Sequence, residues 1–312
     1  MSRRVLLYLL AFGTVVLWGA SFPLTKAALD YLGPTTIALM RWAISAGALI
    51  LWLAWKRRLP VAVQMLRRDG RTAVWVALVG ITLFYFLENL ALRYTTATNA
   101  GVLSNFTAIF MVLIGTIWLG ERLSRVEWGA MAAAFVGAVI VSQGAGHLRL
   151  AGAGLAGDLL MLVASLFGAI YSVGGKGLVA RYPADVVTTV VATLGALLLL
   201  PIALIESGGP GGFTAALLAL PWQAWAALLL LGLGAGALAN LWWLQLLSHT
   251  DASRAALALF LIPVVSTILA VAWLGEPLTP VIVLGALLVL AGVVVVQQHS
   301  GNMRRQAARD GT

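Results

Sequence analysis

Four ionisable side chains stand inside or beside long apolar runs of this sequence: Lys26, Arg41, Glu88 and Arg93. A charge at the centre of a membrane costs about 2.5–3.5 kcal/mol on insertion scales, so such a group persists where it faces a partner or a polar cavity. One interpretation is an ion pair between Glu88 and Lys26 or Arg41. The alternative is that Glu88 meets a ligand's ammonium group or a coupling proton, while Lys26 or Arg41 meets a carboxylate.

Aromatic rings and amides form a second set of candidates. Trp18 and Ser21 are three residues apart, and so are Tyr85 and Glu88, which places each pair on one helical face. An Asn in lipid needs a partner, and a hydrogen bond between helices is the structural alternative to ligand binding. Together these groups predict a cavity with aromatic walls and a few amides, suited to an amphipathic solute. The expected binding residues are Trp18, Ser21, Tyr85, Glu88, Asn89, Asn105, Phe106, Tyr171, Asn240, Trp243 and Phe260.

Catalytic motifs are not evident in the sequence. The three histidines fall in expected loops or in the tail, no serine stands in a G-x-S-x-G setting, and the chain has no cysteine. The run GGKG at 174–177 resembles a phosphate loop only superficially, because Lys176 is followed by Gly instead of Ser or Thr. We therefore expect no enzyme, no metal site and no cofactor.

The composition is that of an all-α integral membrane protein. The 312 residues are 61% hydrophobic and 10% charged, whereas a soluble domain carries about 25% charged residues. Apolar segments of spanning length should be helices, because lipid offers no partner for exposed backbone groups. Ten transmembrane helices are predicted, at 6–26, 35–55, 72–92, 98–118, 126–143, 155–176, 185–206, 222–247, 252–274 and 280–298.

The net charge of +9 indicates orientation in the membrane. With the N-terminus inside, most of the Lys and Arg residues fall on the inner side of the predicted helices, as they do in membrane proteins generally. Only four fall toward the outside, namely Lys26, Arg41, Arg93 and Arg149. Both termini are therefore predicted to be cytoplasmic, and nucleic acid is not expected as a partner.

The chain contains an internal duplication. Residues 95–121 and 250–276 align without a gap, begin with Thr-x-Ala and end with Trp-Leu-Gly-Glu. Each half then holds five predicted helices, and because five is odd the second half enters the membrane from the opposite side. We predict two inverted five-helix repeats, 1–149 and 150–300, followed by a cytoplasmic tail, 301–312. Inverted repeats of this kind are typical of secondary transporters.

In order, spacing and duplication, these elements resemble the EamA-type drug/metabolite transporter superfamily. The matching motifs are Trp18-Gly-Ala-Ser-Phe, Ala91-Leu-Arg-Tyr-Thr-Thr-Ala and the Trp-Leu-Gly-Glu endings at 118–121 and 273–276. Within the superfamily, the sequence is most similar to YddG-type bacterial amino-acid exporters. The resemblance implies a secondary transporter of the bacterial inner membrane that exports small neutral, including aromatic, amino acids or related metabolites by alternating access.

A multidrug or other metabolite efflux transporter of the same fold is the alternative function, because an aromatic cavity would serve it too. The expected partners are a small-molecule substrate and the lipid bilayer, and the sequence leaves oligomeric state and proton coupling open. The resemblance also implies a proline bend in the fourth and ninth helices. Pro263 supplies this hinge in the ninth, but its counterpart in the fourth is Ala108, so we expect the first copy to bend less.

Overall fold

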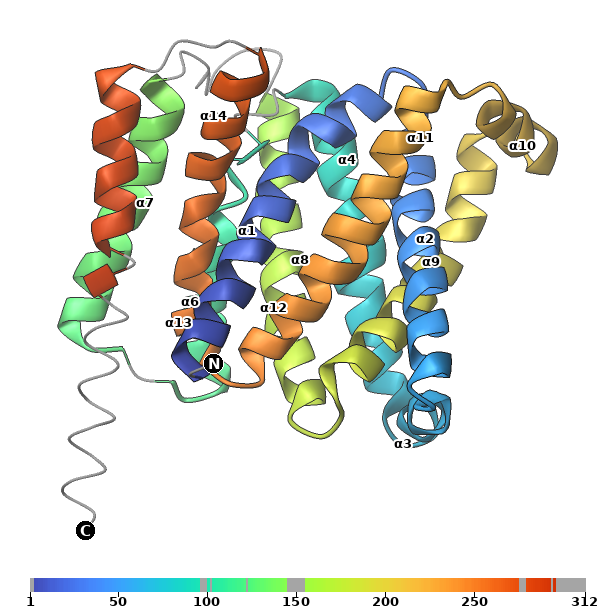
Figure 1. The fold of residues 1–312 in the computed structure, drawn as a ribbon, viewed down its shortest axis with the longest axis horizontal. Helices are drawn as coiled ribbons and strands as arrows, with labels where there is room; N and C mark the ends of the chain where they lie inside the picture. Colours follow the sequence, from blue (N-terminus) through green and yellow to red (C-terminus); the bar gives the residue numbers. More distant parts are fainter. Residues whose placement is uncertain are drawn as a thin grey trace.

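The computed structural model describes residues 3–95, 100–101, 103–121, 123–144, 155–274, 279–292 and 294–295. Within these ranges every regular element is a helix and none is a strand (Figure 1). An all-helical fold is the expected outcome for long apolar runs, because a helix satisfies its own backbone hydrogen bonds in lipid.

Six helical segments are long and apolar enough to cross a membrane. They are α1 (Arg3–Ala28), α2 (Pro34–Trp55), the run of α3 (Leu59–Ala77), η1 (Leu78–Leu83) and α4 (Phe84–Tyr94), α8 (Leu155–Val179), α9 (Ala184–Glu206), and the run of α11 (Trp222–Leu229), η2 (Leu230–Leu238) and α12 (Ala239–Leu247). The remaining helices are α6 (Phe106–Trp118), α7 (Arg125–Gly144), α10 (Pro210–Leu218), α13 (Ala252–Ala255), η3 (Ala256–Phe260), α14 (Leu261–Leu274) and a last helix, Pro280–Gly292.

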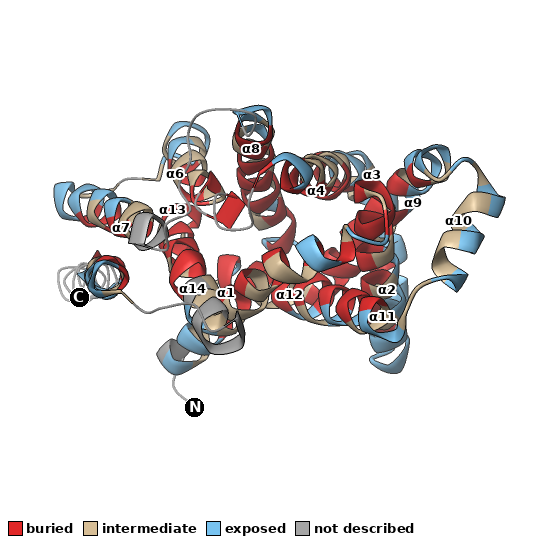
Figure 2. Cartoon of the chain, turned by 90° about the horizontal axis from the view of Figure 1, so that it is seen from above, coloured by how far each residue is buried: buried red, intermediate tan, exposed pale blue. Residues whose placement is uncertain are grey.

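The outward surfaces of these helices are apolar, and the buried residues face the middle of the bundle (Figure 2). Leu51, Ile117 and Leu284 are 72%, 73% and 65% exposed. Large exposed apolar surfaces are unfavourable in water and mark a site of contact with other molecules or with membrane. The solvent for this surface is therefore lipid, and the chain is an integral membrane protein.

Helix boundaries differ from the predicted ones in two places. The helix predicted to begin at 72 begins at Leu59, and it has a kink at Asp69, whose φ of −124° and ψ of 21° are not helical. The glycine-rich stretch 208–212 was expected to be a loop, but α10 begins within it at Pro210. Proline suits the first turn of a helix, because the N–H that it lacks would have no partner there.

Two long helices contain a π-helical stretch at corresponding places in the two halves. η1 interrupts the run from Leu59 to Tyr94, and η2 interrupts the run from Trp222 to Leu247. These are the third and eighth predicted helices, one in each half. π-helical turns are rare and concentrate at functional sites. Their recurrence makes these two helices candidates for carrying the functional site.

The fourth and ninth predicted helices are both interrupted, whether or not they contain proline. The ninth passes through the 3₁₀ segment η3 immediately before Pro263, which lies in the first turn of α14. The fourth has a turn at Ser104 and Asn105 before α6 begins. That turn lies ahead of Ala108, through which α6 continues as a regular helix, so the expectation that the first copy bends less at this point stays a prediction. Part of each repeated stretch, including Glu276, lies outside the described residues.

Helices α2 and α9, the second and seventh predicted helices, pack against each other with opposite directions. At one end the Glu206 carboxylate at the end of α9 accepts hydrogen bonds from the backbone N–H groups of Thr35 and Thr36 at the start of α2, at 3.1 and 2.9 Å. At the other end Arg58 pairs with Asp185 at 2.8 Å. The first contact satisfies N–H groups that a helix start leaves free. Both ends of this pair are thereby fixed.

Candidate functional site

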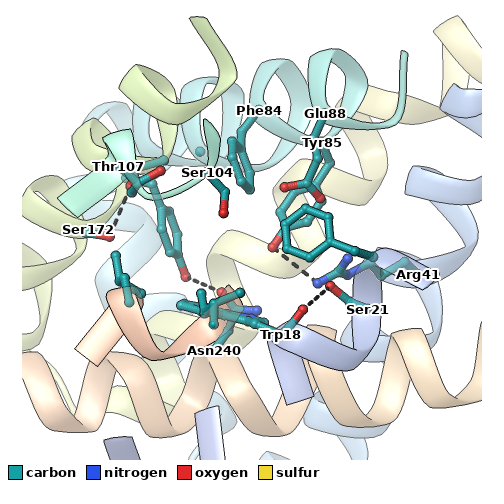
Figure 3. A pocket seen from close by; sticks show the side chains of 16 residues that line it. Trp18, Ser21, Arg41, Phe84, Tyr85, Glu88, Ser104, Thr107, Ser172 and Asn240 are labelled. Atoms are coloured by element: carbon teal, nitrogen blue, oxygen red, sulfur yellow. Dashed lines mark hydrogen bonds between the residues drawn. The ribbon is translucent and has the colours of Figure 1, made fainter. Parts of the chain in front are cut away.

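A small cavity lies between helices that come from both halves of the chain (Figure 3). Its water-accessible volume is about 60 Å³, which is room for a few water molecules. Sites for drug-sized ligands are typically about 300–1,000 Å³, so the described conformation is a narrow one. The lining residues are Trp18, Ser21, Phe22, Arg41, Gly80, Phe84, Tyr85, Glu88, Ser104, Thr107, Gly168, Tyr171, Ser172, Asn240, Leu259 and Ile262.

Arg41 reaches the cavity from α2 and is only 2% exposed. Its Nη2 donates to the Tyr85 hydroxyl and to the Ala235 carbonyl, both at 3.4 Å. The guanidinium carbon lies 4.4 Å from the centre of the Tyr85 ring, within reach of a cation–π attraction. Nε and Nη1 have no hydrogen-bond partner among the residues that the structure describes. A buried guanidinium with two free donor groups is suited to bind a carboxylate.

Glu88 lines the same cavity from α4 and is 6% exposed. Its carboxylate makes no ion pair and no hydrogen bond with any residue that the structure describes. The proposed pairing of Glu88 with Lys26 or Arg41 is therefore not present in this conformation. Lys26 instead donates to the Thr95 carbonyl at 3.2 Å and to that of Leu92. The cavity thus holds a cation and an anion that do not neutralise each other through direct contact.

The π-helical segment η2 supplies a backbone oxygen that organises the wall opposite Glu88. The Ala235 carbonyl accepts hydrogen bonds from Trp18 Nε1 at 3.2 Å and Asn240 Nδ2 at 2.9 Å, in addition to Arg41. Asn240 Nδ2 also donates to the Gly236 carbonyl. One backbone group therefore joins side chains from α1, α2 and α12, which fixes the tryptophan ring and the amide at the cavity wall.

Aromatic side chains continue this wall through contacts of their own. The Tyr171 hydroxyl donates to Asn240 Oδ1 at 3.2 Å. The rings of Trp18 and Trp243 lie 5.3 Å apart, and Trp243 Nε1 donates to the Ser172 hydroxyl at 3.1 Å. Tyrosine and tryptophan that are held by hydrogen bonds lose little further freedom when a ligand packs on them. The aromatic lining is therefore a preformed surface.

Several expected site residues do not line the cavity in this conformation. Asn89 donates to the Pro34 carbonyl at 3.0 Å, and Phe106 packs against Phe135 with ring centres 5.3 Å apart. Trp243 packs against the Trp18 ring, Lys26 contacts backbone carbonyls, and both polar atoms of the buried Asn105 amide lack a hydrogen-bond partner among the described residues. Pro263 and Phe260 are buried outside the lining. Trp18, Ser21, Arg41, Tyr85, Glu88, Tyr171 and Asn240 are the expected residues that the cavity brings together.

Other lining residues were missed by reasoning from sequence. They are small, hydroxyl-bearing or apolar side chains, namely Phe22, Gly80, Phe84, Ser104, Thr107, Gly168, Ser172, Leu259 and Ile262. A search for hydroxyl groups near the expected aromatic residues would have found Ser172, which follows Tyr171, and Ser104, which stands two residues before Phe106. Nothing in the types of Leu259 or Ile262 distinguishes them from core residues.

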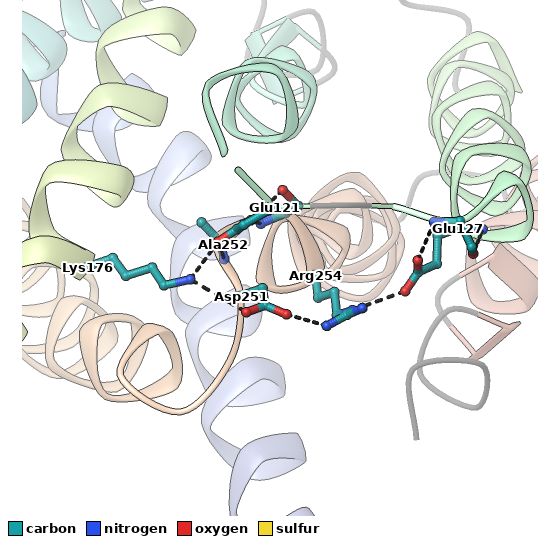
Figure 4. Close-up of polar contacts among 8 residues, drawn as sticks. Glu121, Glu127, Lys176, Asp251, Ala252 and Arg254 are labelled. Atoms are coloured by element: carbon teal, nitrogen blue, oxygen red, sulfur yellow. Dashed lines mark hydrogen bonds and ion pairs between the residues drawn. The ribbon is translucent and has the colours of Figure 1, made fainter. Parts of the chain in front are cut away.

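A second polar cluster, outside the cavity, joins α8, the end of α6 and the start of α13 (Figure 4). Glu121 accepts hydrogen bonds from the backbone N–H groups of Ala252 and Ser253, at 3.0 and 2.9 Å, and pairs with Lys176 at 2.6 Å. Burial alone would raise the pKa of Glu121, but the hydrogen bonds from Lys176 and Ser253 outweigh it and hold the pKa below its usual value.

The same cluster extends through three more ion pairs. Asp251 lies 3.9 Å from Lys176 and also pairs with Arg254, and Arg254 reaches Glu127 at 3.0 Å. Glu121 and Glu127 belong to the first half of the chain, and the other three belong to the second. We call these five residues, Glu121, Glu127, Lys176, Asp251 and Arg254, the charged latch, because they tie the halves together at one end of the bundle.

Metal binding has no candidate in the described part of the chain, where no three His, Asp or Glu side chains gather closely enough to hold an ion. Long apolar helices that enclose a polar and aromatic cavity, with a charged cluster at one end, define a multi-pass helical membrane protein with an internal site for a small solute. The model of the EamA-like transporter family matches residues 5–143 and again 155–297. The chain belongs to this family.

Curated relatives are similar along nearly their whole length. A protein of Archaeoglobus fulgidus called an uncharacterized transporter is 32% identical over 94% of this chain and 98% of its own. A probable terminal-alkyne amino-acid exporter of Streptantibioticus cattleyicolor is 27% identical over 96% of this chain and 95% of its own. A probable amino-acid metabolite efflux pump of Salmonella typhimurium is 26% identical over 92% of this chain and 93% of its own.

The fold also has a match among solved structures. One crystal structure superposes with a TM-score of 0.73, at 19% sequence identity, and the match covers 92% of this chain and 96% of that one. At this identity the likeness concerns the fold alone.

Proposed function

We propose that this protein is a secondary transporter that exports small neutral amino acids, aromatic ones included, or related metabolites. The observation that carries the proposal is that a buried guanidinium and a buried carboxyl group, with no direct contact between them, line one aromatic cavity. Arg41 offers free N–H donors to a carboxylate, and Glu88 offers a carboxylate to an ammonium group. An α-amino acid carries both groups on one carbon. The printed names of the relatives from Streptantibioticus cattleyicolor and Salmonella typhimurium point to the same substrate class.

The rest of the lining suits the side chain of such a substrate. Trp18, Phe84 and Tyr171 offer ring faces, and Ile262 adds an aliphatic surface. An apolar or aromatic side chain buried there gains about 25 cal/mol for each Å² removed from water. The binding energy is divided between charged and apolar contacts, so a substrate can be held specifically and still leave.

Alternating access between two inverted repeats is the mechanism that we propose. Three observations support it: the family model matches the chain twice, π-helical stretches recur in the third and eighth helices, and α2 runs opposite to α9. In this mechanism the charged latch closes one face while the cavity opens toward the other. The narrow cavity of the described conformation must widen before a substrate enters.

The membrane setting proposed here is the bacterial inner membrane, with both termini in the cytoplasm. The excess of Lys and Arg on one side of the predicted helices supports this orientation. The charged latch then lies on the cytoplasmic face, near the start of α1 (Figure 1). The proposed activity is the movement of a solute across the membrane, without a covalent step.

Efflux of hydrophobic drugs is the second candidate function, because aromatic walls bind flat apolar molecules as well. A buried Arg41 counts against it, since an unpaired guanidinium beside a cationic drug is unfavourable. A substrate screen by counterflow in proteoliposomes separates the two functions. We expect exchange of Phe, Trp, Met, Leu or Thr and none of ethidium. Failure of all five amino acids under any gradient would remove the amino-acid proposal, and exchange of ethidium would favour drug efflux.

Proton coupling is proposed to depend on Glu88, the carboxylate that lines the cavity. In a coupled transporter a pH gradient drives accumulation of the substrate, and Glu88→Gln abolishes that accumulation while leaving counterflow measurable. In a facilitator the pH gradient does not drive accumulation of the substrate, even in the wild type. Measuring accumulation and counterflow in the same vesicles distinguishes these cases.

A further inference from the structure

The turn between α2 and α3 carries a concentration of positive charge that the transport cavity does not use. Seven basic residues lie in this turn, along α3 or just after α8, and two of them are neutralised, because Arg58 pairs with Asp185 and Arg181 pairs with Asp69. None of the other five forms an ion pair with a residue that the structure describes, although Arg68 is near enough to Asp69 for a weaker attraction. We call these five the basic corner: Lys56, Arg57, Arg67, Arg68 and Arg71.

Arg57 shows that a cation is kept here at a conformational cost. Its φ is +55°, and among the described residues it is the only non-glycine with positive φ. Its N–H bonds to the Ala54 carbonyl and that of Arg58 bonds to the Leu53 carbonyl, which is the helix-ending motif that favours glycine at this position. The left-handed conformation costs an ordinary residue about 1–2 kcal/mol.

The corresponding turn in the second half follows the usual rule. After α9 the same two hydrogen bonds form, from Gly208 to the Ile205 carbonyl and from Gly209 to the Leu204 carbonyl. Glycine occupies the left-handed position there, with φ of +74°. The fold therefore accepts glycine at this turn, and folding does not require arginine in the first half.

The first turns of α3 place an apolar stripe beside the basic residues. Leu59, Val63 and Leu66 are 39%, 48% and 42% exposed, and their spacing puts them on one helical face. Arg67 and Arg68 line a groove on this helix together with Val63. The kink at Asp69 separates these turns from the part of the helix that enters the bundle. A helix with adjacent apolar and basic faces lies along a membrane surface.

We propose that the basic corner binds the headgroup of an anionic phospholipid, whose acyl chains cover the apolar stripe of α3. Charge complementarity selects the phosphate, and the exposed apolar stripe selects a lipid over a soluble anion. Lys56 lies over the rings of Trp52 and Trp55, at 4.9 and 4.5 Å from their centres, at the level where tryptophans mark the membrane interface. The rule that basic residues face the cytoplasm accounts for charge at this end, but not for arginine in a glycine position.

The test is lipid binding to the detergent-solubilised full chain, by native mass spectrometry with phosphatidylglycerol and phosphatidylcholine. The wild type should bind phosphatidylglycerol more tightly. Each lost cation should weaken that binding about fivefold, so Arg57→Gly costs about fivefold and Arg67→Gln with Arg68→Gln about 30-fold. Arg57→Gly should at the same time leave the unfolding temperature unchanged or raise it, because glycine relieves the left-handed strain.

The matched control is Arg93→Gln with Arg125→Gln, which removes two exposed cations elsewhere and should leave binding unchanged. Glycerol phosphate, which has the charge without the chains, should not displace the lipid. Equal binding of the two lipids, equal loss in the control, or full retention in both corner variants would overturn the proposal. The assay does not involve transport, so its result is independent of what the cavity carries.

Discussion

Arg41 is almost completely buried, and yet two of its nitrogen atoms have no hydrogen-bond partner within the described part of the chain. Leaving a buried charged group unsatisfied costs folding energy, whereas removing the group entirely is neutral or stabilising. A residue kept for stability would have its donors filled. The free donors of Arg41 therefore indicate a role in binding, and the same reasoning applies to the unpaired carboxylate of Glu88.

Replacing Arg41 should separate stability from transport. We expect Arg41→Gln to reduce amino-acid counterflow by about 10–100-fold, because a hydrogen bond to a charged group is worth about 1.5–3 kcal/mol, while the unfolding temperature stays the same or rises. Arg41→Lys should retain part of the activity, since it keeps the charge and loses the paired donors. Counterflow and thermal unfolding of the same preparations check both statements. A large loss of stability without a specific loss of transport would make Arg41 structural.

At the scale of elements, the π-helical stretch η1 brings its backbone against α8. A Cβ atom added at Gly80 would lie 2.3 Å from the side chain of Tyr171, so no larger residue fits without a shift. Gly80 lines the cavity and Tyr171 faces it from the second half of the chain. The close approach of the two halves at the cavity depends on this glycine.

Gly80→Ala should therefore destabilise the protein by about 1–3 kcal/mol, the usual cost of overpacking a well-packed interior. Gly47→Ala is the matched control, because nothing lies within 4 Å of its added Cβ. There the substitution should stabilise the helix by up to about 1 kcal/mol, since alanine is the better helix former. Equal effects of the two substitutions on thermal unfolding would show that η1 and α8 are not tightly packed.

The charged latch should control access to the cavity from its own end. The chain has no cysteine, so Thr107→Cys provides a single reporter in the cavity lining. We expect Lys176→Met to raise its rate of labelling by a membrane-impermeant maleimide several-fold in inside-out vesicles, because Glu121 loses its cation. Lys56 is an exposed lysine at the same end, and Lys56→Met should leave the labelling rate unchanged. An unchanged rate in Lys176→Met would mean that the latch does not hold this face closed.

Acidification should open the latch only at low pH. The pKa of Glu121 lies below its usual value, so the carboxylate stabilises the closed face at every pH above that of an ordinary Glu, about 4.3, and the contribution is lost as the pH falls through the lowered pKa. The rate at which Thr107→Cys is labelled should therefore not change with pH above about pH 5, when it is measured in a Glu88→Gln background so that the cavity carboxyl cannot titrate. A transition near neutral pH in that background would contradict this assignment of Glu121.

Sequence reasoning located much of the cavity because its residues are polar or aromatic in places where lipid allows neither. Trp18, Tyr85 and Glu88 stand out by type, and helical spacing groups them. The packing between helices was not accessible in the same way. Asn105 and Phe106 lie at a break in their helix and do not line the cavity. Ser104 and Asn105 are residues that favour turns, but two such residues within an apolar run did not by themselves predict a break. The π-helical stretches, which position the Ala235 carbonyl, also leave no recognisable pattern.

For the whole molecule, the two halves contribute different parts of one site. Arg41 and Glu88 come from the first half, whereas Tyr171 and Asn240 come from the second. Movement of one half against the other would therefore separate the charged contacts from the aromatic wall. Such a movement releases a bound solute, and the charged latch would have to break as it occurs.

The central claim is that the cavity recognises a zwitterion through Arg41 and Glu88. Its most direct test compares three ligands of similar size in proteoliposome counterflow: phenylalanine, 2-phenylethylamine, which lacks the carboxylate, and 3-phenylpropanoate, which lacks the amine. We expect exchange of phenylalanine, with neither analogue exchanged nor able to compete at equal concentration. Competition by both analogues as strong as that by phenylalanine itself would contradict the claim, because the cavity would then recognise the ring alone.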